Sequence, residues 1–398
     1  MMISTDPPYY DNIGYADLSD FFYIWLRRCL KNIYPDLFKT ITTPKTHELV
    51  AVPYRHDNDK DKAKSFFENG MLETCNQLYQ YASDDIPVTI YYAYKQRDAE
   101  AQYTASSGWE TMLSAIIKAG FAITGTWPMK TENSSRMIGQ GTNALASSIV
   151  LVCRKRTEDA QQTTRHNFVN ELRRELGTAL RKLQQSNIAP VDMPQSAIGP
   201  GMAVFSKYSE VFEADGSTMT VRTALQIINH ELDRYFNEQD GELDSESRFC
   251  VELYAQKGFG IIKFGDADNM ARAKNISIQV LADKGVVYAQ RGYVHLISRD
   301  EIEASVLDDM DIDWLFTQKL TKVMQKEGRE ACAKLLTSAI NSAERAKTLA
   351  YRLYNIAERR KWSQEAYAYN SLVSDWNVIL DRALELQNVP AEQLALAF

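Results

Sequence analysis

The sequence predicts a mixed α/β fold, in which a partial doubly wound sheet in residues 1–156 is followed by a mostly α region in residues 157–398. Two observations predict this division. Short β-branched or aromatic runs alternate with helical patterns up to residue 156, whereas beyond it apolar residues recur mainly three or four positions apart. A chain of 398 residues is long enough for two or three domains and a sizeable core.

The first region is predicted to run strand, helix, helix, strand, helix, strand, strand. The elements are a strand at 1–5, helices at 18–30 and 62–82, a strand at 88–94, a helix at 107–119, and strands at 121–127 and 147–153, with a polar loop at 35–60. Links through helices favour parallel strands with right-handed crossovers, whereas the helix-free link before the last strand favours an antiparallel pair at the sheet edge. Ligands bind such sheets at the carboxyl ends of the strands.

The second region is predicted to be helical at 166–185, 220–236, 245–257 and 269–284, and again from residue 313 onward. Residues 187–220 are rich in Pro, Gly and Met and predict an irregular linker, with a tight turn at Gly199-Pro200-Gly201. Alternation at 286–297 predicts a hairpin that turns at Arg291-Gly292. A helix followed by a two-stranded ribbon is the outline of a winged helix, which commonly binds DNA, but it also occurs in ordinary α+β packing.

Composition and charge narrow the class of protein. No apolar run approaches the roughly 20 residues that span a bilayer, and no signal peptide is expected. Five scattered cysteines without a CxxC pair fit a cytoplasmic protein, and five dispersed histidines predict no metal site. Net charge is −7, yet residues 319–361 hold eleven Lys/Arg and four Asp/Glu, which could neutralise phosphates or simply form a solvated helix face.

The tetrapeptide Asp6-Pro7-Pro8-Tyr9 directly follows the first predicted strand. An exocyclic amine of a DNA base is a poor nucleophile, because its lone pair is delocalised into the ring. The Asp6 carboxylate and the Pro7 carbonyl can accept its hydrogens, and the two prolines fix φ and remove backbone donors. Tyr9 can stack on a base flipped out of the duplex. We therefore predict these four residues as catalytic.

Two further residues near the tetrapeptide are substrate-binding candidates. Tyr10 and Asn12 could line the base pocket or touch the flanking backbone. Asn12 could equally be a turn residue that bonds its own main chain. The structural alternative for Tyr9 and Tyr10 is packing behind a proline-rich turn. Gly258-Phe259-Gly260, with Gly265 and Asp266, has the composition of a nucleotide loop but lacks the preceding strand that such a loop needs.

The segment from Ser4 to Phe22 resembles the large prokaryotic adenine-specific DNA methylases, a family described as containing a zinc ribbon and often found beside phage-defence genes. The likeness continues at 125–129, 199–205, 214–217, 265–267 and 350–354, and so covers only the C-terminal portion of that family. The resemblance implies a methyltransferase that moves a methyl group from S-adenosylmethionine to adenine N6 in DNA, as restriction-modification systems do. Asp6, Pro7, Pro8 and Tyr9 match the catalytic motif residue by residue.

The chain departs from that family in the cofactor half. It has no FxGxG-type loop before residue 6 and no zinc-ribbon cysteines. The cofactor-binding residues are therefore unknown, and the Rossmann-like methyltransferase sheet is expected to lack its cofactor-binding N-terminal strands. Two hypotheses follow: a fragment or split subunit that works with a second polypeptide supplying the cofactor half, or a non-enzymatic DNA-binding or assembly subunit that uses residues 157–398.

Overall fold

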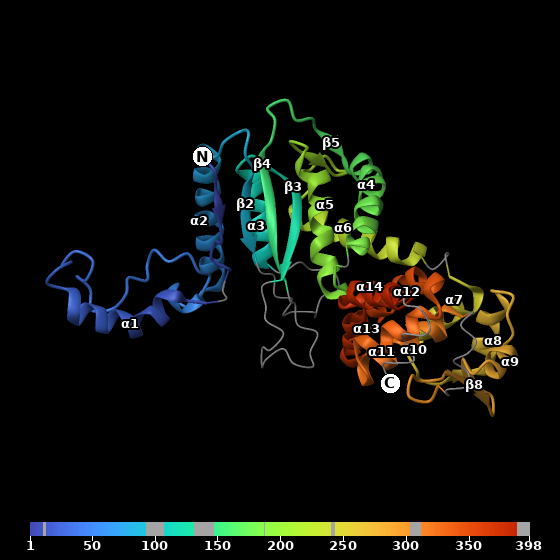
Figure 1. The fold of residues 1–398 in the computed structure, drawn as a ribbon. Coiled ribbons are helices and arrows are strands. Elements are labelled where there is room, and N and C mark those ends of the chain that lie inside the picture. The colour runs from blue at the N-terminus through green and yellow to red at the C-terminus, as the bar shows by residue number, and fades with distance from the viewer. Residues whose placement is uncertain are drawn as a thin grey trace. The chain divides into compact units, whose positions relative to one another are not determined.

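The computed structural model describes residues 1–10, 13–92, 107–130, 147–186, 188–239, 243–302 and 312–387, and the fold is mixed α/β (Figure 1). The chain divides into two compact units. Unit 1 comprises the described residues of Met1–Thr131, Ser147–Ala179 and Gln195–Glu231, and unit 2 comprises those of Leu180–Pro194 and Leu232–Phe398. The functional division at residue 156 stays a prediction.

Unit 1 is built on a four-stranded sheet with the order β1-β2-β4-β3. Strand β1 (Ser4–Thr5) lies parallel to β2 (Val88–Tyr92), and β4 (Ser147–Lys155) lies antiparallel to both β2 and β3 (Phe121–Lys130). The antiparallel pair predicted at the sheet edge is present, with β3 as the outer strand. At the opposite edge, β1 pairs only with β2 among the described strands.

Helices α2 (Lys60–Tyr81) and α3 (Ser107–Lys118) cover one face of this sheet (Figure 1). Asp59 begins α2 by accepting hydrogen bonds from the backbone N–H groups of Asp61 and Lys62. The face of α2 that carries Phe67, Met71 and Cys75 is buried, as its helical spacing predicts. Alternate residues of β2 are buried as well, so the core of unit 1 lies between these helices and the sheet.

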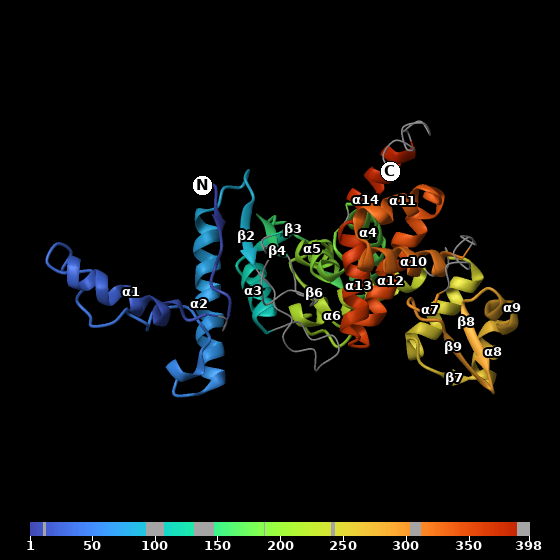
Figure 2. The ribbon, with the colours of Figure 1, turned by 60° about the horizontal axis from the view of Figure 1, so that its bottom comes forward.

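Helix α1 (Tyr15–Leu30) differs from the other predicted helices of unit 1. Its helical spacing is confirmed, but of its 16 residues, all of them described, only Ala16 is buried. Figures 1 and 2 both show α1 extending away from α2 and the sheet. Residues 31–59 return from α1 to α2 and include a short 3₁₀ turn at Pro53–Arg55.

The predicted linker at 187–220 is wrong, because it contains helix α5 (Met193–Ser206) and the short strand β6 (Val211–Phe212), which pairs with β5 (Thr163–Thr164). The predicted turn at Gly199-Pro200-Gly201 lies inside α5. A Cβ atom on Gly199 would stand 2.0 Å from Thr126 Oγ1, so the glycine permits a close contact with β3. Pro200 cannot donate to Ser196 O four residues earlier, and that oxygen accepts a hydrogen bond from Thr126 Oγ1 at 3.2 Å. Tertiary contacts thus explain residues that look like turn formers.

The predicted helices at 166–185 and 220–236 are confirmed as α4 (Arg165–Gln185) and α6 (Val221–Gln239). The remaining elements belong to unit 2. They are α7 (Ser245–Lys257), β7 (Ile262–Lys263), α8 (Phe264–Arg272), α9 (Ile278–Asp283), β8 (Val287–Gln290), β9 (Tyr293–Leu296), α10 (Asp313–Lys326), α11 (Arg329–Thr337), α12 (Ala343–Arg359), α13 (Ser363–Ser374) and α14 (Trp376–Gln387).

The predicted helix at 269–284 is wrong, because two helices, α8 and α9, occupy its place. Asn275 adopts a left-handed conformation with φ of 58°, and Ser277 caps the start of α9. The hairpin of β8 and β9 is confirmed, and its turn residues Arg291 and Gly292 have φ of 55° and 82°. A third strand, β7, pairs with β9.

The core of unit 2 is aromatic. Tyr254, Trp314, Tyr351, Tyr369 and Trp376 are fully buried, so large aromatic side chains fill the interior of this unit. Arg299 and Glu365 form an ion pair beside this core, and Gln318 bonds both Arg299 and Tyr369. No helix among the described residues is long and apolar enough to cross a membrane.

Candidate functional site

The tetrapeptide lies at the carboxyl end of β1, where Asp6 directly follows the last strand residue. The Asp6 side chain is exposed, and the Tyr9 hydroxyl donates a hydrogen bond to Asp6 Oδ1 at 2.7 Å. Pro8 is exposed and Pro7 is half-buried. The turn therefore brings its first and last residues together and holds a carboxylate at the surface.

An aromatic cluster supports the tetrapeptide from the neighbouring strand. The Tyr9 and Tyr92 rings lie 4.9 Å apart at an angle of 67°, and Tyr92 in turn lies 5.2 Å from Trp109 at the start of α3. Tyr92 is the last residue of β2, so the carboxyl ends of two parallel strands meet here. A Cβ atom on Gly108 would stand 3.0 Å from the Tyr92 hydroxyl oxygen, so this glycine allows α3 to begin beside the cluster.

Tyr10 is held from two sides. Its ring lies 5.1 Å from the ring of buried Phe67 in α2, and its carbonyl accepts a hydrogen bond from the backbone N–H of Ala51 at 2.8 Å. Its φ is 25°, which is unusual for a residue with a side chain. These contacts favour the packing interpretation for Tyr10, and its substrate-binding role stays a prediction. Asn12 lies outside the described residues.

The glycine-rich segment at 258–266 does not form a nucleotide loop. Gly258 ends α7 with φ of 62°, and its N–H donates to Tyr254 O at 2.8 Å. The Phe259 ring packs 5.4 Å from the Tyr254 ring, and Gly265 and Asp266 belong to α8. None of these described residues forms a strand–turn–helix cradle, so they do not fit S-adenosylmethionine.

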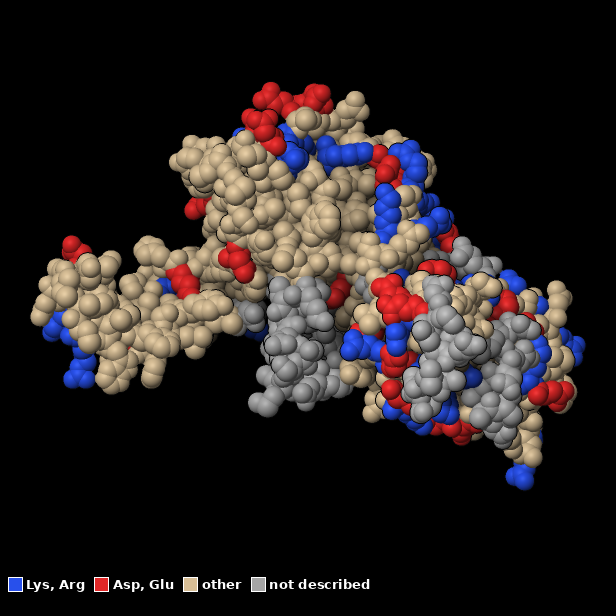
Figure 3. Space-filling view, viewed as in Figure 1, with Lys and Arg blue, Asp and Glu red and all other residues tan. Residues whose placement is uncertain are grey.

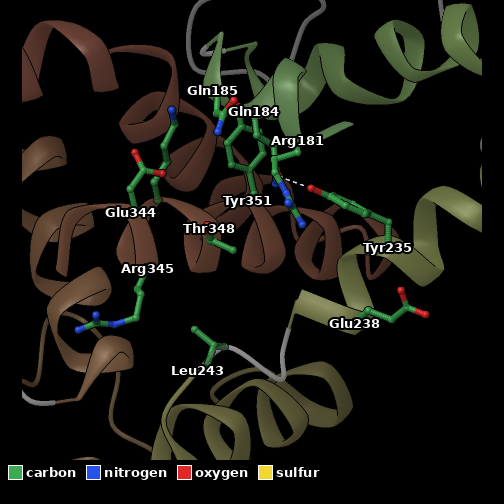
Figure 4. Close-up of a pocket in the computed structure, with 11 residues that line it drawn as sticks. Arg181, Gln184, Gln185, Tyr235, Glu238, Leu243, Glu344, Arg345, Thr348 and Tyr351 are labelled. Carbon is green, nitrogen blue, oxygen red and sulfur yellow. Dashed lines mark hydrogen bonds between the residues drawn. The ribbon is translucent and has the colours of Figure 1, made fainter. Parts of the chain in front are cut away.

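Two hollows lie elsewhere. The hollow in unit 1 has a volume of about 550 Å³ and is lined by residues of α2, α3 and the 205–221 segment. The hollow in unit 2 has a volume of about 310 Å³ and lies between the ends of α4 and α6 and the side of α12 (Figure 4). In the latter, the Tyr235 hydroxyl donates to Gln184 Oε1 at 2.9 Å, and Lys347 is only 4% exposed. Burial lowers the pKa of Lys347, although Glu344 opposes this shift. Neither hollow is lined by Asp6 to Tyr10.

The described residues contain no group of three or more His, Cys, Asp or Glu side chains that could hold a metal ion. Sequence reasoning singled out Asp6 and Tyr9, whose catalytic roles stay predictions, but it did not place Tyr92, Gly108 and Trp109 beside them. The available signal was the rule that carboxyl ends of parallel strands meet, which brings the last residue of β2 beside the residue that follows β1.

Comparison with known proteins gives one partial match. Residues 244–396 match a family described as a domain of unknown function (DUF8807), and the match lies within unit 2. No curated protein and no solved structure matches the chain. The match sets the C-terminal region apart as a recurring module and assigns no activity to it.

Proposed function

We propose that this chain is the half of an adenine-N6 DNA methyltransferase that carries the catalytic motif and the target-recognition region. The observation that supports this most directly is the surface carboxylate of Asp6, held by the Tyr9 hydroxyl at 2.7 Å at the carboxyl end of a parallel strand. Doubly wound sheets bind their ligands at that position. The parallel β1–β2 pair and the antiparallel β4 are compatible with a partial methyltransferase sheet that lacks its cofactor strands.

The proposed chemistry uses acceptors and a flat ring. The Asp6 carboxylate and the Pro7 carbonyl accept the two hydrogens of adenine N6, which localises the lone pair on nitrogen. Because Tyr9 already bonds Asp6 Oδ1, we assign Oδ2 to the amine. The Tyr9 ring stacks on the extruded base, while Tyr92 supports it from behind. When bound, S-adenosylmethionine would supply the methyl group and leave as S-adenosylhomocysteine, and one N6 proton would leave through the Asp6 carboxylate. Positioning would provide most of the acceleration.

Target recognition is proposed for the winged-helix-like part of unit 2. The order α7, β7, α8, α9, β8, β9, with β7 paired to β9, places a hairpin beside two short helices (Figure 2). Tyr288 and Tyr293 are 49% and 53% exposed on this hairpin and could contact nucleic acid. This arrangement also supports the second candidate function, a DNA-binding or assembly subunit without catalysis.

The basic stretch at 319–361 gives less support to DNA binding. Four of its cations form ion pairs with acidic side chains, namely Lys326 with Asp300, Arg329 with Asp375, Arg345 with Asp313 and Arg359 with Asp233. In Figure 3, Lys/Arg and Asp/Glu side chains alternate over the visible face of unit 2. The solvated-face interpretation therefore fits this stretch better.

The two candidate functions are separated by an assay on the native assembly. The tagged chain is purified, with the polypeptides that bind it, from the cells that produce it. DNA is then incubated with the preparation and labelled S-adenosylmethionine, and N6-methyladenine is measured by mass spectrometry. Methylation supports the enzyme. DNA binding with no methyl transfer supports the subunit instead.

A further inference from the structure

The segment of residues 13–55, here called the arm, has its apolar side chains on the outside. Along α1, Leu18, Phe21, Phe22, Trp25 and Leu26 recur at intervals of three, four and one, so they share one helix face. These side chains are 49% to 66% exposed. A helix face of this kind is normally buried against a core.

The polar face of α1 is already occupied by the rest of the arm. Asp20 accepts hydrogen bonds from Lys45 Nζ at 2.7 Å and from the Thr43 N–H at 2.8 Å. Arg55 donates to Asp17 Oδ2 at 2.8 Å, and Arg27 Nε donates to Phe38 O at 3.2 Å. Because these bonds fix the orientation of the helix, its apolar face is left as the outer surface.

The exposed apolar area of the arm is large. It is contributed by Ile13, Tyr15, Leu18, Phe21, Phe22, Ile24, Trp25, Leu26, Ile33, Tyr34, Leu37, Ile41 and Tyr54. At about 200 Å² for a whole large side chain, their exposed portions amount to roughly 1,500 Å². A stable interface buries about 800 Å² per partner, so the arm exposes enough apolar surface to take part in one. Figure 3 shows that the visible face of the arm is mostly uncharged.

An unpaired sheet edge belongs to the same part of the chain. Strand β1 pairs with β2 alone among the described strands, so its other edge presents free backbone donors and acceptors. Such an edge is a template for pairing with a strand of another polypeptide. Nine residues separate the end of β1 from the start of α1, so one partner could cover both surfaces.

We propose that the apolar face of α1 and the open edge of β1 form one docking surface for a polypeptide that adds parallel strands to the sheet and carries a glycine-rich loop for S-adenosylmethionine. This inference rests on the proposed function and identifies its partner. A second copy of the chain fits less well, since a two-fold interface would pair β1 with β1 in antiparallel fashion.

The test compares the wild-type chain with the double variant Phe22→Asp/Trp25→Asp and with a matched control, Val378→Asp, at an exposed apolar position of α14 in unit 2. Each tagged chain is purified from its own cells, and bound S-adenosylmethionine is crosslinked with ultraviolet light. We expect the wild type and Val378→Asp to retain an equimolar polypeptide that crosslinks the cofactor. The double variant should retain about tenfold less, while its circular dichroism and thermal midpoint stay those of the wild type.

A second readout needs no substitution. Cys29 is exposed on α1, so iodoacetamide should alkylate it in the free chain and react much more slowly in the complex. Equal alkylation rates would overturn the proposal. Three other results would also overturn the proposal. They are a wild-type homodimer that the double variant abolishes, Trp25-dependent binding to phosphatidylglycerol vesicles, and a retained protein that does not crosslink the cofactor.

The failure of this inference differs from the failure of the proposed function. A complex that methylates adenine but assembles equally well with the double variant would remove the docking surface and leave the function. A complex that assembles through α1 and binds the cofactor, yet transfers no methyl group to DNA, would remove the function and leave the docking surface.

Discussion

Removing the Arg55 side chain should release the arm from its fixed orientation. Arg55 is only 11% exposed and bridges Glu48 Oε2 at 2.5 Å and Asp17 Oδ2 at 2.8 Å, while the Tyr54 hydroxyl also donates to Asp17. The variant Arg55→Met leaves both carboxylates without this cation. Each charge-assisted bond is worth about 1.5–3 kcal/mol when shielded. Because Asp17 is 39% exposed, we discount the pair to about 2 kcal/mol for local opening of the arm.

That free energy corresponds to roughly 30-fold faster amide exchange in α1. Hydrogen-exchange mass spectrometry should show this increase in peptides from 16–30 and no change in α2. The control Lys62→Met removes an ion pair to Asp57 whose partners are 60% and 85% exposed, so it should leave both regions unchanged. Unchanged exchange in α1 of Arg55→Met would refute the idea that this network orients the helix.

The same network predicts a dependence on pH. Hydrogen bonds from Tyr54 and Arg55 lower the pKa of Asp17 below its usual value of 3.8. A carboxyl group with a depressed pKa stabilises the folded state above its unfolded value and loses that contribution as the pH falls through its folded value. Exchange in α1, corrected for the intrinsic rate, should therefore be constant near neutral pH and rise below about pH 4.

Three further predictions concern packing, a buried charge and thiol reactivity. Gly199→Ala should lower the free energy of unfolding by about 2 kcal/mol, because its Cβ would stand 2.0 Å from Thr126 Oγ1. The control Gly265→Ala places its Cβ in open space and should be neutral or slightly stabilising. Equal thermal midpoints for the two variants would contradict this prediction. Lys347→Met should stabilise the protein by about 1 kcal/mol in urea denaturation at pH 7. This gain should shrink toward pH 10.5, because the unfolded chain holds the Lys347 proton more tightly than the folded one; a loss of stability at pH 7 would contradict it. Cys29 is exposed and should be the one thiol that reacts quickly with a disulfide reagent at pH 8. The other four thiols should react slowly, because burial raises the pKa of each; they are Cys75, Cys153, Cys250 and Cys332. Two or more fast thiols would refute the described burial.

Local signals explain what the sequence predicted correctly. The hairpin was predictable because the alternation at 286–297 is interrupted at Gly292, whose φ of 82° is one that glycine adopts easily. The buried face of α2 was predictable because Phe67, Met71 and Cys75 recur at helical spacing. The four motif residues were singled out by their chemical types and order, and their catalytic role stays a prediction.

Contacts between distant segments explain what the sequence did not predict. Helix α5 carries Gly199 where β3 approaches closely and Gly201 where Ile228 of α6 does, so a composition typical of linkers forms a buried helix. The spacing in α1 predicted a helix but gave no indication that its apolar face would be exposed, since periodicity does not show what lies opposite. Tyr92 was missed because its place beside Tyr9 depends on strand pairing 83 positions away.

The most direct test of the proposed function is the rate of adenine methylation by the native assembly containing Asp6→Asn. The asparagine keeps the shape of the side chain but replaces an acceptor oxygen with a donor, so we expect the rate constant to fall by roughly 10²–10³ while DNA and cofactor binding stay unchanged. Asp85→Asn, an exposed carboxylate before the opposite end of β2, serves as the control and should retain full activity. A rate for Asp6→Asn within about twofold of the wild type, well under 1.4 kcal/mol of lost transition-state stabilisation, would contradict the role of this carboxylate.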